Sequence, residues 1–320
     1  MQLIKMNESK PAKKALMRAV SALRKGGLVV FPTETVYGLG ASVSNRKAVD
    51  KIFRIKGRPT DNPLIVHIGK IKQLDLLAKE VGIGTERLIE KFWPGPLTLI
   101  LKKKQDVPSN VTAGLDTVAV RMPSNRIARK LAEIAGPIAA PSANKSGGLS
   151  PTDAEHAIED LTETDRKKIG VVIDAGKTEF GLESTVFDPA KKLILRPGPI
   201  TLRQLRRYVP ETRYSTNSSK HPQSPGMKYK HYSPKAELIL FIGNREKIAE
   251  RMKERRDGRT AVLKLDGNKK HAAETVYSKL REFDRSGFKR IICEGIDEKG
   301  LGYTIMDRLK KAASEIVTVR

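Results

Sequence analysis

The sequence predicts an α/β protein with two domains of unequal size. At 320 residues the chain exceeds what one ordinary hydrophobic core needs, so two domains are the default expectation. Short apolar runs alternate with segments of helical periodicity along the whole chain, and this alternation is typical of α/β folds. Between residues 210 and 235 the composition turns polar and proline-bearing, which indicates a linker. We therefore predict a first domain over residues 1–209, a linker over 210–235 and a second domain over 236–320.

Helix caps and helix stops support the predicted elements of the first domain. Asn45 precedes one helical segment as a cap, and Gly26 with Gly27 ends the first helix. The loops are rich in proline, glycine, serine and threonine. We expect helices over residues 11–25, 46–56, 71–79, 85–92, 126–135, 153–161 and 202–208, and strands over 28–31, 64–68, 97–101, 117–122, 137–140, 171–174, 184–188 and 193–195.

The second domain has a simpler pattern, in which strands and helices alternate strictly. Such an alternation predicts a small parallel sheet with helices on its faces. Cys293 lies in one of these apolar runs, so we interpret it as a buried core residue and not as a reactive thiol. A single cysteine excludes an internal disulfide and a cysteine zinc site. The expected strands are 238–242, 261–265 and 290–293, and the expected helices are 245–256, 271–283 and 304–313.

The chain is strongly basic, with a net charge of +25 from 61 basic and 36 acidic side chains. Such a field favours anionic partners such as nucleotides, pyrophosphate and RNA. The excess is spread over both domains, which is typical of a generally basic surface, and an RNA-binding face is the sharper alternative. Aromatic residues, at 5%, offer few platforms for base stacking. No apolar run is long enough for a membrane and no signal peptide is present, so we expect a soluble, cytoplasmic protein without a membrane partner.

Several familiar sequence signals are incomplete in this chain. Gly176-Lys177-Thr178 resembles the end of a phosphate-binding P-loop, but Val171 stands where that loop needs glycine for its tight turn. Gly38-Leu39-Gly40 is not followed by a third glycine in the register of a dinucleotide-binding turn. The five histidines are scattered and form neither a metal-spaced cluster nor part of a Ser-His-Asp set. These incomplete motifs argue against a P-loop protein, a dinucleotide-binding protein, a histidine-ligated metal site and a Ser-His-Asp hydrolase.

Polar side chains gather at the ends of the predicted strands, where open α/β sheets bind ligands. Arginine can hold a carboxylate in a bidentate fork, and several cations together suit a phosphate. No obvious nucleophile or pair of general bases is present, so we expect catalysis by positioning and charge neutralisation. The candidate pocket has the cations Lys56, Arg58, Arg121 and Arg196, the hydroxyls of Thr33, Ser142 and Ser184, and the side chains of Asn144 and His67.

Short motifs in a fixed order identify a family. PTETVYGLG, KGRP followed by NPL and IVH, WPGPLT, VAVRMP, PSAN, EST and RPG resemble the YrdC-type threonylcarbamoyl-AMP synthase family, and PGMKYKHYSP with the appended βαβ domain resembles its longer, two-domain form. The resemblance covers nearly the whole chain. It implies a twisted, open α/β sheet with a concave, basic face, and a smaller Rossmann-like C-terminal domain. The linker would form a lid over the active site.

The resemblance also implies the residues of two substrate sites. The family's Lys-x-Arg and Ser-x-Asn signature falls on Lys56, Arg58, Ser142 and Asn144, and we expect Lys56 and Arg58 to stabilise charge on the phosphates during catalysis. Further ATP contacts carry over to Thr117, Ser150, Arg196 and, from the lid, Tyr232. The L-threonine contacts carry over to Thr33, His67, Arg121, the backbone near Ala140, and Ser184.

The implied reaction joins L-threonine, bicarbonate and ATP into threonylcarbamoyl-AMP, with release of pyrophosphate and water. A tRNA threonylcarbamoyl transferase complex would use this product to make N6-threonylcarbamoyladenosine in tRNAs that read codons starting with adenosine. We expect Mg²⁺ to accompany ATP on its phosphates without dedicated protein ligands.

Other interpretations compete with this reaction. The basic charge alone supports an RNA-binding module of the same fold, and weak RNA binding could accompany the enzyme. The carbamoyl-adenylating step of hydrogenase maturation uses a related domain but needs zinc-finger cysteines. Taken alone, His67 is a strand residue, and for Glu34 and Glu183 we expect loop-shaping hydrogen bonds in place of acid–base roles. We interpret the second domain as a structural anchor for the lid.

Overall fold

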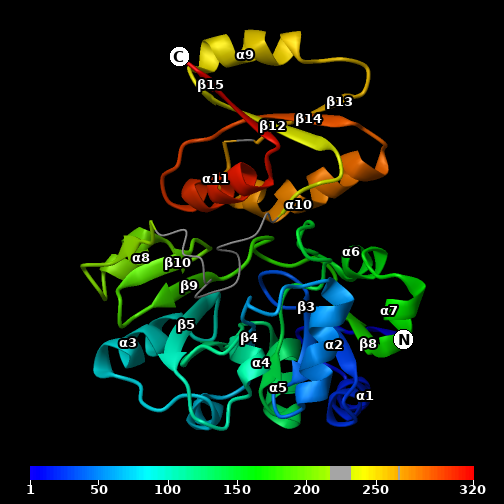
Figure 1. The fold of residues 1–320 in the computed structure, drawn as a ribbon, viewed down its shortest axis with the longest axis vertical. Coiled ribbons are helices and arrows are strands. Elements are labelled where there is room, and N and C mark those ends of the chain that lie inside the picture. Colours follow the sequence, from blue (N-terminus) through cyan, green and yellow to red (C-terminus); the bar gives the residue numbers. More distant parts are fainter. Residues whose placement is uncertain (217–231, 266) are drawn as a thin grey trace. The chain divides into compact units, whose positions relative to one another are not determined.

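The computed structural model describes residues 1–216, 232–265 and 267–320. It divides into two compact units, one formed by Met1–Ser146 and Pro151–Lys228 and the other by Gly147–Ser150 and Tyr229–Arg320. Each unit is built on its own β-sheet with helices (Figure 1), which confirms the predicted α/β class. Most of the predicted lid, residues 217–231, lies outside the described residues.

The first unit contains an 11-stranded sheet in the part that the structure describes, in the order β1-β8-β2-β3-β7-β4-β6-β5-β9-β10-β11. Its pairs are mixed, since β4 and β6 are parallel whereas β7 runs antiparallel to both β3 and β4. The strands are β1 (Gln2–Lys5), β2 (Leu28–Phe31), β3 (Gly38–Ser42), β4 (Ile65–His67), β5 (Leu97–Lys102), β6 (Thr117–Arg121), β7 (Ile138–Ala139), β8 (Ile169–Asp174), β9 (Thr185–Asp188), β10 (Leu193–Arg196) and β11 (Arg213–Tyr214).

Helices cover both faces of this sheet. Alternate residues of β2 serve the two faces, because side chains alternate along a strand: Val29 and Phe31 pack with α1 and α5, whereas Leu28 and Val30 join the larger core cluster that includes α2. The helices are α1 (Lys13–Arg24), α2 (Arg46–Lys56), the 3₁₀ helix η1 (Ile71–Leu76), α3 (Ile83–Phe92), α4 (Ser109–Thr112), α5 (Arg126–Ala135), α6 (Ala154–Glu159), α7 (Glu163–Lys168) and α8 (Leu202–Arg206).

Strand β3 shows why part of the first unit was missed from the sequence. Its glycines resemble a loop, yet Gly40 is needed inside the sheet, since a Cβ there would lie 2.7 Å from both a Phe31 and an Ile138 side-chain atom. The predicted helix 71–79 is a shorter 3₁₀ helix. The short or edge elements β1, β11, α4 and α7 also went unpredicted, because each buries too little apolar surface to show a clear period.

The second unit has a four-stranded sheet in the order β13-β14-β12-β15, and all its pairs are parallel. Figure 1 shows α9 on one face and α10 with α11 on the other, which confirms the predicted small parallel sheet. Cys293 is fully buried in β14, and burial raises the pKa of its thiol to about 12, so the core interpretation is confirmed. The elements are β12 (Glu237–Gly243), α9 (Arg245–Glu254), β13 (Thr260–Leu263), α10 (Lys269–Arg285), β14 (Arg290–Glu294), α11 (Leu301–Ala312) and the unpredicted β15 (Glu315–Val319).

Candidate active site

Helix α2 places the first two cations of the predicted nucleotide signature. Asn45 starts the helix, because its side-chain oxygen accepts a hydrogen bond from a backbone N–H of the first turn. Gly57 ends the helix in the left-handed conformation, with φ at 62°, and the Arg58 backbone N–H then donates to the Phe53 carbonyl. Lys56 is therefore the last residue of the helix, and Arg58 directly follows the left-handed Gly57.

The Lys56 side chain is bonded to the loop that carries the other half of the signature. Its Nζ donates to the Ser142 carbonyl at 2.6 Å and to the Asn144 carbonyl. In return the Ser146 backbone N–H donates to the Lys56 carbonyl at 2.8 Å. Burial and the neighbouring Arg58 charge hold the pKa of Lys56 well below the usual range of lysine. The structure thus brings Lys56 near Arg58 and bonds Lys56 to the backbone of the loop that carries Ser142 and Asn144.

A second lysine braces the same loop. Lys145 Nζ donates to the Ile55 carbonyl at 2.5 Å and pairs with an Asp165 oxygen at 2.6 Å. Asp165 also accepts from the Thr162 backbone N–H at 3.2 Å, as part of a capping box at the start of α7. The Asn144 side-chain amide donates to the Lys145 carbonyl at 2.7 Å. The loop is therefore held both from the end of α2 and from the start of α7.

Arg58 is directed at the segment that follows it. Its Nε donates to the Asn62 carbonyl at 3.0 Å, and its Nη2 donates to Asn62 Oδ1 at 2.6 Å and to the Pro63 carbonyl at 2.7 Å. The KGRP and NPL motifs thus fold onto each other, and the second orients the guanidinium of the first. Asn62 and Pro63 follow Arg58 closely enough in the chain to hold its guanidinium in place.

Arg121 ends β6 beside His67 at the end of β4. Its Nε donates to the Gly95 carbonyl at 3.2 Å and its Nη1 donates to the Thr35 hydroxyl at 2.8 Å. Its Nη2 forms an ion pair with Glu34 Oε1 at 2.7 Å, and both side chains are almost fully buried, at 4% and 3% exposure. The two atoms meet as an ion pair and not as an aligned hydrogen bond. The loop-shaping hydrogen bonds expected for Glu34 are thus replaced by a buried charge pair.

The Thr33 hydroxyl is enclosed by its own turn. It donates to the Val36 carbonyl at 2.7 Å and accepts from the backbone N–H groups of Thr35 and Val36. A hydroxyl has a single proton, so in the 2.8 Å contact between the two threonine hydroxyls Thr35 must donate to Thr33. A directed chain of hydrogen bonds therefore runs from Arg121 through Thr35 and Thr33 to the Val36 carbonyl. The predicted contact of Thr33 with L-threonine stays a prediction.

His67 is buried with its ring against the edge of Phe31, at 5.8 Å between ring centroids and 87° between planes. The absence of a Cβ at Gly40 leaves room for the Phe31 ring across β3. Burial, reinforced by the Arg121 charge, lowers the pKa of His67 to about 3, so the imidazole is neutral at physiological pH. Its buried Nδ1 has no hydrogen-bond partner among the described residues. A neutral imidazole in this position can accept or donate a hydrogen bond to a ligand.

Ser184 and Arg196 join the two predicted substrate sites. Arg196 donates from Nε and Nη2 to the Ser184 carbonyl at 3.1 and 2.9 Å, and from Nη2 to the Ser184 hydroxyl at 3.0 Å. The same hydroxyl lies 2.8 Å from the hydroxyl of Thr98 in β5. The predicted L-threonine contact and the predicted ATP contact are therefore directly bonded to each other.

The other predicted contacts of the first unit lie on strands next to these groups. Thr117 opens β6 and pairs with Lys102 of β5, and no contact within the described ranges joins it to the Lys56 cluster. The Ala140 backbone N–H donates to the Ile65 carbonyl at 2.9 Å, just beyond the end of β7. The roles assigned to both residues stay predictions.

Two predicted ATP contacts belong to the second unit. Ser150 is buried at the end of the segment Gly147–Ser150. Tyr232 is buried with φ at 67°, stacks on Tyr277 at 5.8 Å between ring centroids, and has the Arg308 guanidinium 4.9 Å above its ring. Within their own unit both side chains are therefore well packed.

Several site residues were not found from the sequence. Thr98 lies in an apolar strand run, and nothing in the sequence marks it as a partner of Ser184. Asp165 had a readable signal, because Thr162 three positions earlier forms a capping box with it. Lys145 stands directly after the predicted Asn144, and its proximity along the chain was its only signal.

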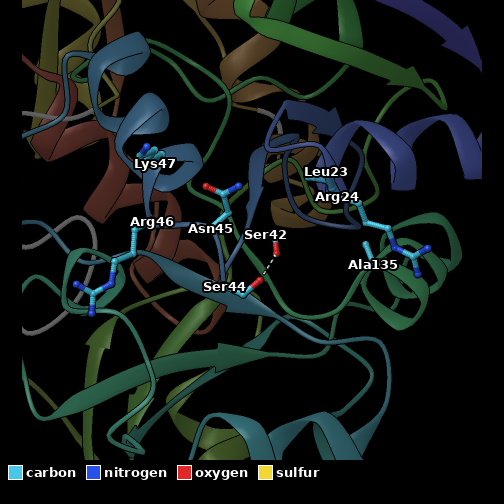
Figure 2. A pocket seen from close by; sticks show the side chains of 8 residues that line it. All are labelled: Leu23, Arg24, Ser42, Ser44, Asn45, Arg46, Lys47 and Ala135. Carbon is cyan, nitrogen blue, oxygen red and sulfur yellow. Dashed lines mark hydrogen bonds between the residues drawn. The ribbon is translucent and has the colours of Figure 1, made fainter.

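A cationic pocket of about 510 Å³ lies at the other end of α2. Figure 2 shows Arg24, Arg46 and Lys47 around it, with the hydroxyls of Ser42 and Ser44 joined by a hydrogen bond. An 11-residue helix spans about 16 Å, so this pocket is separate from the cluster at Lys56. None of the predicted site residues lines it.

The donor set of the candidate site suits phosphates better than a metal ion. Lysine, arginine and amide N–H groups donate hydrogen bonds and do not coordinate Mg²⁺, which prefers carboxylate and water oxygens. Within residues 1–216, 232–265 and 267–320 no three His, Cys, Asp or Glu side chains are grouped to hold a metal ion. The expected binding of Mg²⁺ through the ATP phosphates stays a prediction. No helix within the same ranges is long and apolar enough to cross a membrane.

Buried lysine and arginine side chains at the ends of a helix and of strands in a mixed α/β sheet favour the class of proteins that bind anionic small molecules. Comparison with known families narrows this class. Residues 21–198 match the Sua5/YciO/YrdC family model, described as telomere recombination, and residues 200–314 match the model described as threonylcarbamoyl-AMP synthase, C-terminal domain. The chain belongs to the Sua5/YciO/YrdC family, which confirms the family predicted from the motifs.

Relatives match along nearly the whole chain. The threonylcarbamoyl-AMP synthase of Pyrococcus abyssi is 44% identical over 319 residues, which cover 92% of this chain and 93% of the relative. That of Bacillus subtilis is 43% identical over 324 residues, with 93% and 92% coverage. The crystal structure of P. abyssi Sua5 complexed with L-threonine superimposes with a TM-score of 0.92 at 42% identity and covers 100% of both chains. The function predicted from the motifs is therefore the one that these full-length relatives bear.

Proposed function

We propose that this chain is a threonylcarbamoyl-AMP synthase, a nucleotidyltransferase that joins L-threonine, bicarbonate and ATP into threonylcarbamoyl-AMP, pyrophosphate and water. One observation carries the nucleotide half of this proposal. Lys56 is buried and its Nζ contacts only carbonyl oxygens among the described residues, so its charge lacks a carboxylate partner there. A phosphate would supply the missing negative charge and would favour the charged form of Lys56, whose pKa is lowered by burial.

The amino-acid half rests on Arg121 and on the relatives. A buried guanidinium with remaining N–H groups binds a small carboxylate in a bidentate fork. The P. abyssi structure contains L-threonine, and this chain shares its fold and 42% of its sequence. We therefore assign the substrate carboxylate to Arg121 and further contacts to His67, Ser184 and the backbone near Ala140.

The reaction needs positioning and charge neutralisation from these side chains. The threonine amine forms a bond to the bicarbonate-derived carbon with loss of water, and the resulting carboxylate attacks the α-phosphorus of ATP, from which pyrophosphate leaves. Lys56 and Arg58 would neutralise charge on the phosphates, and the Ser184–Arg196 bond would hold the two substrates side by side. Mg²⁺, brought in with ATP, would lower the charge of the phosphates further.

We also propose the partners that follow from this product. Threonylcarbamoyl-AMP is an activated acyl-adenylate, so a transferase complex must consume it to place the threonylcarbamoyl group on tRNA. We propose that the activity is in the cytoplasm, beside the tRNA pool. The basic surface, with a net charge of +25, suits a weak contact with RNA during that transfer.

The test is pyrophosphate release by the purified chain with ATP and Mg²⁺, with L-threonine and bicarbonate supplied together or left out singly. We expect release that requires both. Release that ignores the amino acid, or no release at all, would contradict the synthase assignment. RNA binding without any such release would favour the RNA-binding module.

A further inference from the structure

We infer that Glu34 is a positioning residue for L-threonine recognition, acting through the Arg121 guanidinium. This inference rests on the proposed function, because Arg121 must be the group that holds the substrate carboxylate. Both oxygens of Glu34 are buried within the protein. Glu34 Oε1 lies 2.7 Å from Arg121 Nη2, so Glu34 can act on the substrate through the guanidinium that it faces.

Some N–H groups of Arg121 remain available for a ligand. A guanidinium carries five N–H groups in a fixed plane. Gly95 and Thr35 each take one, and Glu34 faces one on Nη2. One N–H on Nη1 and the N–H groups on Nη2 then stay without a hydrogen-bond partner among the described residues. A carboxylate that accepts from one N–H on each of these two nitrogens forms a bidentate fork.

Three protein groups fix the plane of the Arg121 guanidinium. The Gly95 carbonyl and the Thr35 hydroxyl hold the Nε and Nη1 sides, and the Glu34 charge holds the Nη2 side. The Thr35 hydroxyl is committed in direction by its donation to Thr33. Without the Glu34 charge the Nη2 side would have no protein partner in the described residues. Glu34 thus decides where the Nη2 end of the fork points.

Glu34 also balances the charge of the buried Arg121 side chain. Arg121 is buried, and a buried cation without a counter-charge is unfavourable. Glu34 compensates it before the substrate arrives, so the guanidinium stays in place in the empty site. The Glu34 backbone carbonyl accepts from the Phe180 N–H at 2.8 Å, which anchors the main chain from which the carboxylate projects. The pair is therefore preorganised for a carboxylate ligand.

Glu34→Gln tests the inference, because it keeps the size of the side chain and removes its charge. We expect the dissociation constant of L-threonine, measured by calorimetry without turnover, to rise about tenfold to a hundredfold, which is the cost of a fork misplaced by about 1 Å. The KM for ATP should stay unchanged. Glu34→Asp keeps the charge and should restore part of the affinity. Unchanged or tighter L-threonine binding in Glu34→Gln would overturn the inference, since Glu34 would then only compete with the substrate carboxylate.

A double-mutant cycle with Arg121→Lys separates positioning from a structural role. If Glu34 acts through the fork, Glu34→Gln should add little once the fork is gone. Full additivity of the two effects would overturn the inference. Asp188→Asn is the matched control, because Asp188 is another buried carboxylate in an ion pair, with Lys191 at 3.8 Å. It should lower stability and leave L-threonine binding unchanged.

The same experiment separates this inference from the proposed function. Wild-type chain that releases pyrophosphate only with L-threonine and bicarbonate keeps the synthase assignment, whatever the Glu34 variants do. Wild-type chain that binds no L-threonine overturns the assignment and the inference together. Normal wild-type turnover with unaltered binding in Glu34→Gln overturns the inference alone.

Discussion

Two of the buried cations, Lys56 and Arg121, are held in opposite ways. Lys56 donates to two backbone carbonyls, and no carboxylate within the described residues contacts its Nζ. Arg121 is already paired with the Glu34 carboxylate, in addition to a carbonyl and a hydroxyl. The lysine site therefore has a charge that a ligand must balance, whereas the arginine site is balanced in advance.

This difference matches the two substrates. ATP brings several negative charges, and an unbalanced ammonium gains most from them. An amino acid brings one carboxylate and one amine and has no net charge at neutral pH. A balanced but oriented guanidinium selects it by geometry instead of by charge. If this contrast holds, changes at Lys56 should affect the use of ATP and changes at Arg121 should affect the use of L-threonine.

Lys56→Ala should give the largest effect. It removes the unbalanced charge and both bonds to the Ser142 and Asn144 carbonyls. We expect kcat/KM for ATP to fall about 100- to 1000-fold in a pyrophosphate-release assay, as for the loss of one strong transition-state donor. L-threonine binding should change little. An equal loss for both substrates would abolish the contrast between the two sites.

Arg121→Lys should give the next largest effect, on the other substrate. Lysine keeps the charge beside Glu34 but lacks the planar fork. We expect the KM for L-threonine to rise about tenfold to a hundredfold, with the KM for ATP unchanged, in steady-state kinetics. If lysine supports normal L-threonine use, charge and not geometry governs this site.

Asp165→Asn should weaken the brace on the nucleotide loop. It removes the charge that faces Lys145, whose side chain is partly exposed. We expect the KM for ATP to rise a few-fold and the free energy of unfolding to fall by about 1 kcal/mol or less. Glu163→Gln on the same helix is the control, because Glu163 pairs with Lys167 only at an exposed surface and at 3.8 Å. Similar ATP kinetics in both variants would show that the brace is unimportant.

Lowering the pH should reveal the buried neutral histidine. The pKa of His67 is lowered from 6.5 to about 3, so between these values the unfolded chain binds a proton that the folded chain does not. This contribution to stability is therefore lost as the pH falls through that window, by about 1 kcal/mol between pH 6.5 and 5.5. The measurement is urea unfolding of wild type and His67→Gln at both pH values. An identical pH response of the two proteins would contradict burial of the neutral form.

Much of this architecture could be predicted from the sequence, and the failures have physical reasons. Lys56 reaches the loop of Ser142 and Asn144 because Asn45 and Gly57 fix both ends of α2, and these two ends could be predicted from the sequence. Strand β3 was missed because its glycines are required by a neighbouring aromatic ring, which only the folded sheet reveals.

Long-range pairing limits prediction of the site in the same way. Glu34 and Arg121 are distant in sequence, and no local pattern shows that a loop acid will meet a strand-end arginine. The hydroxyl of Thr98 likewise meets Ser184 only across two strands. Types of residue at strand ends were thus predictable, whereas their partners were not.

Because its single cysteine is buried, this chain is suited to fluorescent labelling at thiols introduced on its surface. Cys293 is fully buried and its thiol is held in the unreactive form, so native protein should resist alkylation by maleimides. A thiol introduced at exposed Ile83 and another at exposed Lys253 would then be the only sites to accept a fluorophore. A donor and an acceptor dye at these positions would report the distance between the two units in single molecules, while ATP and L-threonine are added in turn.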